Sequence, residues 1–166
     1  MTRAYVIIGN PESRKSSVMR ALTGASGFAP KNLQNNVKQV ALKDDRVIDV
    51  FVFISSMQEG EEGEYAKSPG ELIADCDEFP YVLLPLWVKE GKTKNLPDFK
   101  GYFDQMGQSG WIVENIAVLG HRKIGSSKNN PFANYNMPAP TIYLPHSASS
   151  PTNLTASKIR TAWGWM

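Results

Sequence analysis

A glycine, a lysine and a serine stand near the start of the chain at a spacing that suits phosphate chemistry. Gly9 is followed by five residues and then by Lys15 and Ser16. In such a loop, backbone N–H groups converge on phosphate oxygens, the lysine neutralises the outer phosphates and the next hydroxyl holds Mg²⁺. The predicted binding residues are Gly9, Asn10, Pro11, Glu12, Ser13, Arg14, Lys15, Ser16 and Ser17, with Ser16 as the metal ligand.

Arg14 departs from this pattern, because a glycine is expected directly before the lysine. Glycine allows a close approach of the backbone to phosphate and adopts positive φ without strain. Two outcomes stay open: the loop binds phosphate in a changed shape with Arg14 as a second cation, or the loop is a relic and Arg14 faces solvent. A third interpretation is a plain Gly-Asn-Pro turn that joins a strand to a helix.

The elements that must position this loop can be predicted from the pattern of apolar residues. Residues 4–8 are continuously apolar, as in a buried parallel strand, and residues 15–23 form an amphipathic helix. Residues 37–42 and 47–54 are joined by a four-residue polar turn, so they pair antiparallel. Three more helices are predicted at 68–78, 97–106 and 151–163, and three more strands at 81–88, 111–119 and 141–144.

This alternation of strands and helices predicts one α/β domain over residues 1–166, with three α/β/α layers. The sheet should be mostly parallel with one antiparallel edge strand. Pro85 falls inside the predicted strand 81–88, where it requires a bulge or an edge position. Parallel sheets bind ligands beyond the carboxyl ends of their strands, which is where the segment after residue 8 lies.

The segment from Gly9 to Gly24, GNPESRKSSVMRALTG, resembles the first G box of translation-factor-type small GTPases. It is most similar to the G domains of bacterial ferrous-iron transporters and ribosome-assembly GTPases, and the match covers 16 of 166 residues. The resemblance implies a P-loop NTPase-like fold that binds ATP or GTP with Mg²⁺. It also implies that Lys15 neutralises developing charge and that Gln58, where the family has its mobile switch, positions a water.

The other boxes of that family are degenerate in this chain. Met57 stands where the family has a metal-holding aspartate, and methionine does not serve a hard cation. Gly120-His-Arg-Lys123 stands where the family reads guanine with Asn-Lys-x-Asp, so the choice between adenine and guanine stays open. The last box is matched by two common residues, in His146-Ser147-Ala148. The resemblance therefore implies weak or lost hydrolysis, at most that of a slow NTPase.

Composition narrows the remaining function classes. The formal charge of +2 gives no support for nucleic acid as a partner, and the single Cys76 fits a reducing compartment. No apolar run is long enough for a signal peptide core or a membrane span, so we expect a cytoplasmic protein without a membrane partner. Two hypotheses remain: a nucleotide-binding P-loop protein, and a pseudo-GTPase that binds protein partners and no longer binds nucleotide.

Overall fold

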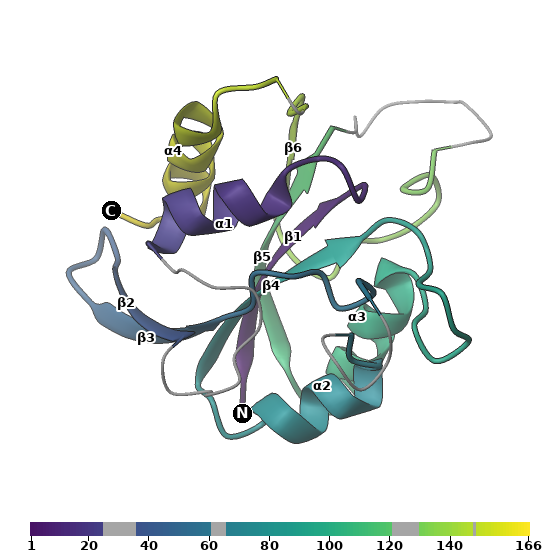
Figure 1. Ribbon diagram of the computed structural model, residues 1–166. Coiled ribbons are helices and arrows are strands. Elements are labelled where there is room, and N and C mark those ends of the chain that lie inside the picture. Colours follow the sequence, from purple (N-terminus) through teal and green to yellow (C-terminus); the bar gives the residue numbers. More distant parts are fainter. Residues whose placement is uncertain (25–35, 61–65, 121–129, 148) are drawn as a thin grey trace.

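The computed structural model describes residues 1–24, 36–60, 66–120, 130–147 and 149–166, and these form one sheet covered by helices (Figure 1). Every element predicted from the sequence is present, with ends that differ by at most two residues. The strands are β1 (Arg3–Gly9), β2 (Val37–Ala41), β3 (Val47–Val52), β4 (Tyr81–Trp87), β5 (Ile112–Leu119) and β6 (Thr141–Leu144). The helices are α1 (Lys15–Thr23), α2 (Pro69–Cys76), α3 (Phe99–Gln108) and α4 (Thr152–Trp163).

The sheet has the order β2-β3-β4-β1-β5-β6. All neighbouring strands are parallel except β2 and β3, which pair antiparallel from Val37↔Phe51 to Ala41↔Val47. The predicted parallel sheet with one antiparallel edge strand is therefore confirmed. β1 lies in the interior of the sheet, paired with β4 on one side and β5 on the other.

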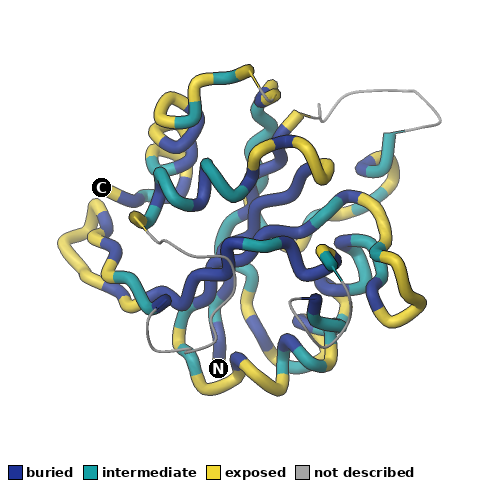
Figure 2. The backbone as a smooth tube through the Cα atoms, viewed as in Figure 1, coloured by how far each residue is buried: buried dark blue, intermediate teal, exposed yellow. Residues whose placement is uncertain are grey.

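The two faces of the sheet carry separate hydrophobic cores, because successive side chains of a strand point to opposite faces. Tyr5 and Ile7 belong to the core beneath α1 and α4, whereas Val6 and Ile8 belong to the core beneath α2 and α3. Figure 1 shows these helix pairs on opposite sides of the sheet, and Figure 2 shows buried backbone running between them. The three-layer prediction is confirmed.

Pro85 lies in an interior strand without a bulge, which corrects the prediction that it needs an edge or a bulge. The pairing of β3 with β4 ends at Val52↔Leu83. Beyond that point the carbonyl of Leu83 accepts from the N–H of Phe53 at 2.9 Å, and the carbonyl of Pro85 accepts from Met57 at 3.3 Å. The backbone polar groups of Pro85 therefore point to the side of β4 on which β3 has already ended. Because no described strand pairs with β4 there, the N–H that proline lacks removes no hydrogen bond from the sheet.

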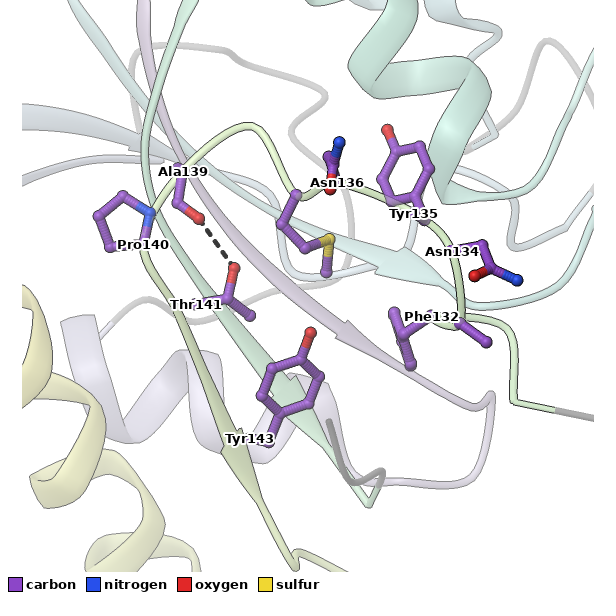
Figure 3. Close-up of a pocket in the computed structure, with 10 residues that line it drawn as sticks. Phe132, Asn134, Tyr135, Asn136, Ala139, Pro140, Thr141 and Tyr143 are labelled. Atoms are coloured by element: carbon purple, nitrogen blue, oxygen red, sulfur yellow. Dashed lines mark hydrogen bonds between the residues drawn. The ribbon is translucent and has the colours of Figure 1, made fainter. Parts of the chain in front are cut away.

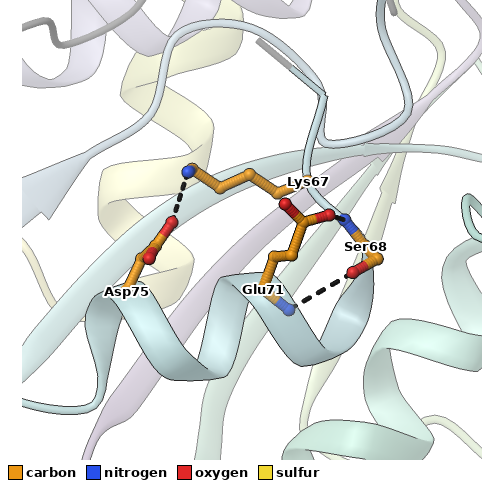
Figure 4. Close-up of polar contacts among 4 residues, drawn as sticks. All are labelled: Lys67, Ser68, Glu71 and Asp75. Carbon is orange, nitrogen blue, oxygen red and sulfur yellow. Dashed lines mark hydrogen bonds and ion pairs between the residues drawn. The ribbon is translucent and has the colours of Figure 1, made fainter. Parts of the chain in front are cut away.

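The start of α2 has a capping box formed by Ser68 and Glu71 (Figure 4). The hydroxyl of Ser68 accepts from the N–H of Glu71 at 3.3 Å, and the Glu71 carboxylate accepts from the N–H of Ser68 at 3.0 Å. The latter bond is the main reason that the pKa of Glu71 lies below its usual value. Lys67 adds an ion pair of 2.5 Å with Asp75.

The last residues of the described chain close the α1/α4 side of the sheet. Trp163 and Trp165 are buried and contact the ring of Tyr5, with centroids 5.2 and 4.9 Å away. The N–H of Met166 donates to the carbonyl of Ala41 at 2.8 Å. Through these contacts the terminal aromatic residues pack on the sheet. Among the described helices, none has the length and apolar character needed to cross a membrane.

Candidate functional site

The segment that follows β1 forms a tight loop between the sheet and α1. The N–H and hydroxyl of Ser13 both donate to the carbonyl of Asn10, at 3.1 and 2.8 Å. Ser13 packs so closely on Gly9 that a Cβ placed on Gly9 would lie 2.5 Å from Ser13 Oγ. An alanine at position 9 would therefore force the Ser13 hydroxyl to move from its bond to Asn10, whether or not a ligand binds. Three of the predicted residues, Asn10, Pro11 and Glu12, are exposed at the rim of the loop.

Arg14 has the backbone conformation that a glycine would adopt easily. Its φ and ψ are 61° and 37°, in the left-handed region, and it is the N-cap residue of α1. A residue with a side chain loses roughly 1–2 kcal/mol in that conformation. Arg14 thus adopts a backbone conformation that glycine would adopt without this strain. The strain is borne by an exposed arginine, which makes no side-chain cap to the helix.

The first turn of α1 directs unpaired N–H groups toward the loop. The backbone N–H groups of Glu12, Lys15, Ser16 and Ser17 donate no hydrogen bond to another described residue. The first intrahelical bond is made by Val18, whose N–H donates to the carbonyl of Arg14 at 3.3 Å. Free N–H groups at the positive end of a helix are suited to a phosphate or another anion.

Lys15 is buried within the loop, at 4% exposure. Its ammonium donates to the carbonyls of Gly9 and Asn10 at 3.1 and 2.7 Å, and lies 3.3 Å from Ser13 Oγ. No ion pair with a carboxylate accompanies it in the described chain. Burial therefore lowers the pKa of Lys15 from 10.5 to about 8, although the charge of Glu59 acts in the opposite direction. The site holds a desolvated cation that lacks a bonded counter-ion.

Ser16 lies close to the end of β3, and its hydroxyl donates to the carbonyl of Ile54 at 3.2 Å. The described residues contain no group of three or more His, Cys, Asp or Glu side chains that could hold a metal ion. Met57 is buried in the core beneath α2 and α3. A Mg²⁺ ion at this loop would thus rely on the Ser16 hydroxyl together with phosphate oxygens and water, a ligand set that Mg²⁺ accepts.

Gln58, predicted to position a water, is fully buried and bonded at both ends of its amide. Its nitrogen donates to the carbonyls of Trp87 and Pro97 at 3.1 and 3.3 Å, and its oxygen accepts from the N–H of Trp87 at 2.9 Å. The side chain therefore joins the segment after β3 to the end of β4. In this arrangement it has a structural role, and the catalytic prediction stays untested.

Little in the sequence indicated that His146 lies near the candidate site. It is 3% exposed, with Nδ1 2.7 Å from the hydroxyl of Thr155, while Nε2 has no partner among the described residues. Burial lowers its pKa, and so does the positive charge of Arg14, which places His146 near the loop. The sequence had indicated His146 only through its place in the weakly matched segment His146-Ser147-Ala148 after the last strand.

Residues 121–123, which stand where the resembled family reads guanine, lie outside the described part of the chain. Gly120, which precedes them, follows the end of β5 with a φ of 80°. The structure therefore brings together Gly9, Ser13, Lys15, Ser16 and the first turn of α1, with Arg14 and His146 beside them. No protein-family model, no curated protein and no solved structure was found to match the chain.

Proposed function

We propose that the loop from Gly9 to Ser17 binds the phosphate groups of a nucleotide, and that hydrolysis is weak or absent. The observation that carries this proposal is the buried ammonium of Lys15. It lies among carbonyl oxygens at the start of α1, beside N–H groups that have no hydrogen-bond acceptor in the described chain. A phosphate would supply the missing anion and accept from those N–H groups at the same time.

Binding would raise the pKa of Lys15 again, because a phosphate stabilises the protonated amine. It would also require Lys15 to exchange at least one carbonyl for a phosphate oxygen. The carbonyls would remain paired, because Gly9 also accepts from the N–H of Val88 and Asn10 from Ser13. The loop can therefore release its lysine without leaving buried acceptors unsatisfied.

The groups around Ser16 support weak or absent nucleotide hydrolysis. The nearest part of the chain after β3 offers the carbonyl of Ile54 and the buried thioether of Met57, and Gln58 is bonded to backbone. Mg²⁺, when bound with the nucleotide, would supply charge neutralisation on the phosphates. None of these described residues is placed to deprotonate or align an attacking water. If nucleotide fails to bind, the remaining hypothesis is a pseudo-GTPase that acts through protein contacts.

Calorimetric titration with tripolyphosphate, ATP and GTP, each with and without Mg²⁺, tests the proposal. Lys15→Met removes the ammonium while keeping an apolar stem of similar length. Lys43→Met is the matched control, because Lys43 is exposed in the β2–β3 turn. We expect binding by the wild type and by Lys43→Met, and a loss of at least about tenfold in affinity for Lys15→Met, since charged hydrogen bonds contribute about 1.5–3 kcal/mol.

Tripolyphosphate distinguishes phosphate recognition from base recognition. Binding of all three ligands with similar affinity would support a site that reads phosphate alone. The absence of detectable binding for all three at millimolar concentration, with the wild type folded by circular dichroism, would overturn the proposal. Equal affinities for the wild type and Lys15→Met would overturn the role given to Lys15.

A further inference from the structure

The structure has a pocket of about 460 Å³ between the segment 132–137 and the edge strand β6 (Figure 3). Phe132 on its wall belongs to the core beneath α2 and α3, whereas α1 packs on the other face of the sheet. The pocket is therefore separate from the phosphate loop. Within the loop itself, Arg14 stands where the resembled family has a glycine.

The backbone strain at Arg14 points to a function for its side chain. Three residues other than glycine have a positive φ in the described part of the chain, namely Arg14, Asp45 and Asn134. Asp and Asn visit this conformation more readily than other residues, because their short polar side chains bond locally. An arginine has no short polar group of this kind. Strained backbone is typical of ligand-binding loops, where the strained residue serves the ligand.

Arg14 and Lys15 place their charges on different sides of the loop. Lys15 is buried at the end of β1, where its ammonium donates to the carbonyls of Gly9 and Asn10. Arg14 is exposed, and its position is indicated by His146, which follows β6. Burial lowers the pKa of His146, and the positive charge of Arg14 lowers it further. Because β5 separates β1 from β6, the guanidinium lies on the β6 side of the loop.

The free N–H groups of the first turn begin directly after Arg14. Those of Lys15, Ser16 and Ser17 donate no hydrogen bond to another described residue. Together with the Lys15 ammonium they are suited to one phosphate group. A second, linked phosphate brings further negative charge. A guanidinium meets that charge with two parallel N–H donors, a geometry that an ammonium cannot provide.

We propose that Arg14 is a specificity-determining residue, which makes the loop prefer nucleoside di- and triphosphates over monophosphates. This inference rests on the proposed binding of phosphate at the loop. One phosphate would accept from the N–H groups of the first turn beside Lys15, and the next phosphate would accept two bonds from the Arg14 guanidinium. A glycine at position 14 would adopt the same backbone conformation without strain, but it would contribute no charge.

Calorimetric titration of the full chain with the mono-, di- and triphosphates of adenosine and guanosine, each with and without Mg²⁺, tests the proposal. Affinities are compared among ligands with the same base, so any preference for a base drops out. Arg14→Gly removes the charge and the strain, whereas Arg14→Gln removes the charge and keeps a polar side chain. Arg46→Gln is the matched control, because Arg46 is exposed in the β2–β3 turn.

We expect the wild type and Arg46→Gln to bind the diphosphate at least about tenfold more tightly than the monophosphate with the same base. Both Arg14 variants should bind the di- and triphosphates at least about fivefold more weakly than the wild type does, since each loses a charged, bidentate contact. For the monophosphate their affinities should stay within about twofold of the wild type.

The proposed function and this inference fail in different ways. If none of the six nucleotides binds to the folded wild type, both are overturned. If the diphosphate binds and Lys15→Met weakens it, while both Arg14 variants bind it as tightly as the wild type or more tightly, only the role of Arg14 is overturned. Equal affinities of the wild type for the mono- and diphosphate would also overturn that role.

The position of the guanidinium is tested without any ligand. An NMR titration of the His146 imidazole should give a higher pKa in Arg14→Gly and Arg14→Gln than in the wild type, because a nearby positive charge has been removed. Arg46→Gln should leave the pKa of His146 unchanged. A pKa that is the same in both Arg14 variants and the wild type would overturn the placement of the guanidinium on the β6 side of the loop.

Discussion

Replacing Lys15 with methionine is expected to make the folded protein more stable at neutral pH, although under the proposed function the same change should weaken phosphate binding. Lys15 is 4% exposed, and its ammonium is held by two carbonyls and a hydroxyl, without an ion-paired carboxylate in the described chain. Methionine fills a similar volume. The carbonyls of Gly9 and Asn10 keep the N–H groups of Val88 and Ser13 as partners, so the substitution leaves no buried acceptor unpaired.

The size of the effect follows from the pKa of Lys15, which burial lowers from 10.5 to about 8. That difference corresponds to about 3 kcal/mol of stability lost on burying the protonated amine. Between pH 8 and 10.5 the unfolded chain binds the proton more often than the folded chain does. The wild type therefore gains stability as pH rises, by about 1.4 kcal/mol per pH unit, and the advantage of Lys15→Met shrinks toward zero near pH 10.5.

Urea unfolding of both proteins between about pH 7 and pH 10.5, followed by circular dichroism, measures this difference. The stability of the wild type is subtracted from that of Lys15→Met at each pH, because burial also raises the pKa of Cys76 to about 12. That shift lowers the stability of both proteins equally above pH 9, so it cancels in the difference. Lys43→Met controls for the loss of one surface charge. The reasoning is refuted if Lys15→Met is the less stable protein at pH 7, or if the difference between the two curves does not change with pH.

Substitutions at three other positions test the site by stability. Arg14→Gly should stabilise by up to about 1 kcal/mol, because relief of the left-handed strain exceeds the added unfolded-state entropy, whereas Arg14→Ala should give no such gain. Gly9→Ala should destabilise by about 1–3 kcal/mol and impair phosphate binding, because its Cβ would lie 2.5 Å from Ser13 Oγ. Gln58→Ala should lower the free energy of unfolding by about 2–4 kcal/mol, because the N–H of Trp87 loses its acceptor and a cavity forms.

For each of these substitutions, one outcome would contradict the expected effect. Equal stabilities for Arg14→Gly and Arg14→Ala in thermal unfolding would mean that the backbone at position 14 carries no strain. Addition of Ser13→Ala should recover part of the stability lost in Gly9→Ala, and a failure to do so would argue against a clash with Ser13 Oγ as the cause of the loss. An unchanged unfolding midpoint for Gln58→Ala would show that its hydrogen bonds are dispensable.

The order and type of the elements could be predicted from the chain because the signals are local. The run of apolar residues in β1, the polar turn between β2 and β3, and the Ser68–Glu71 capping box each act within a few residues. The predicted ends of α3 each differ from the observed ends by two residues. The helix begins at Phe99 because the Asp98 carboxylate caps the N–H of Lys100, a bond that the pattern of apolar residues does not reveal.

The loop of the candidate site could be predicted from the sequence, whereas the positions of the residues around the loop could not. The spacing from Gly9 to Ser16 located the tight turn and the helix start, yet the inward position of Lys15 depends on carbonyls that only the folded loop presents. Gln58 was assigned from its place in a resemblance, and its true partners lie 29 and 39 residues further along the chain, at Trp87 and Pro97. His146 likewise approaches Arg14 through tertiary contacts that no local pattern records.

The position of β1 in the sheet has a consequence for how the protein is made. Among the described strands β1 pairs only with β4 and β5, so residues 3–9 find their first partner in residues 81–87. At about 5–20 residues per second, a ribosome needs roughly 5–15 s to reach them. During that interval the apolar segment before Gly9 has no sheet to join, and the loop lacks its anchor at Val88. The loop after Gly9 can therefore take its final shape only once residues 81–88 have been made, although it precedes them in the chain.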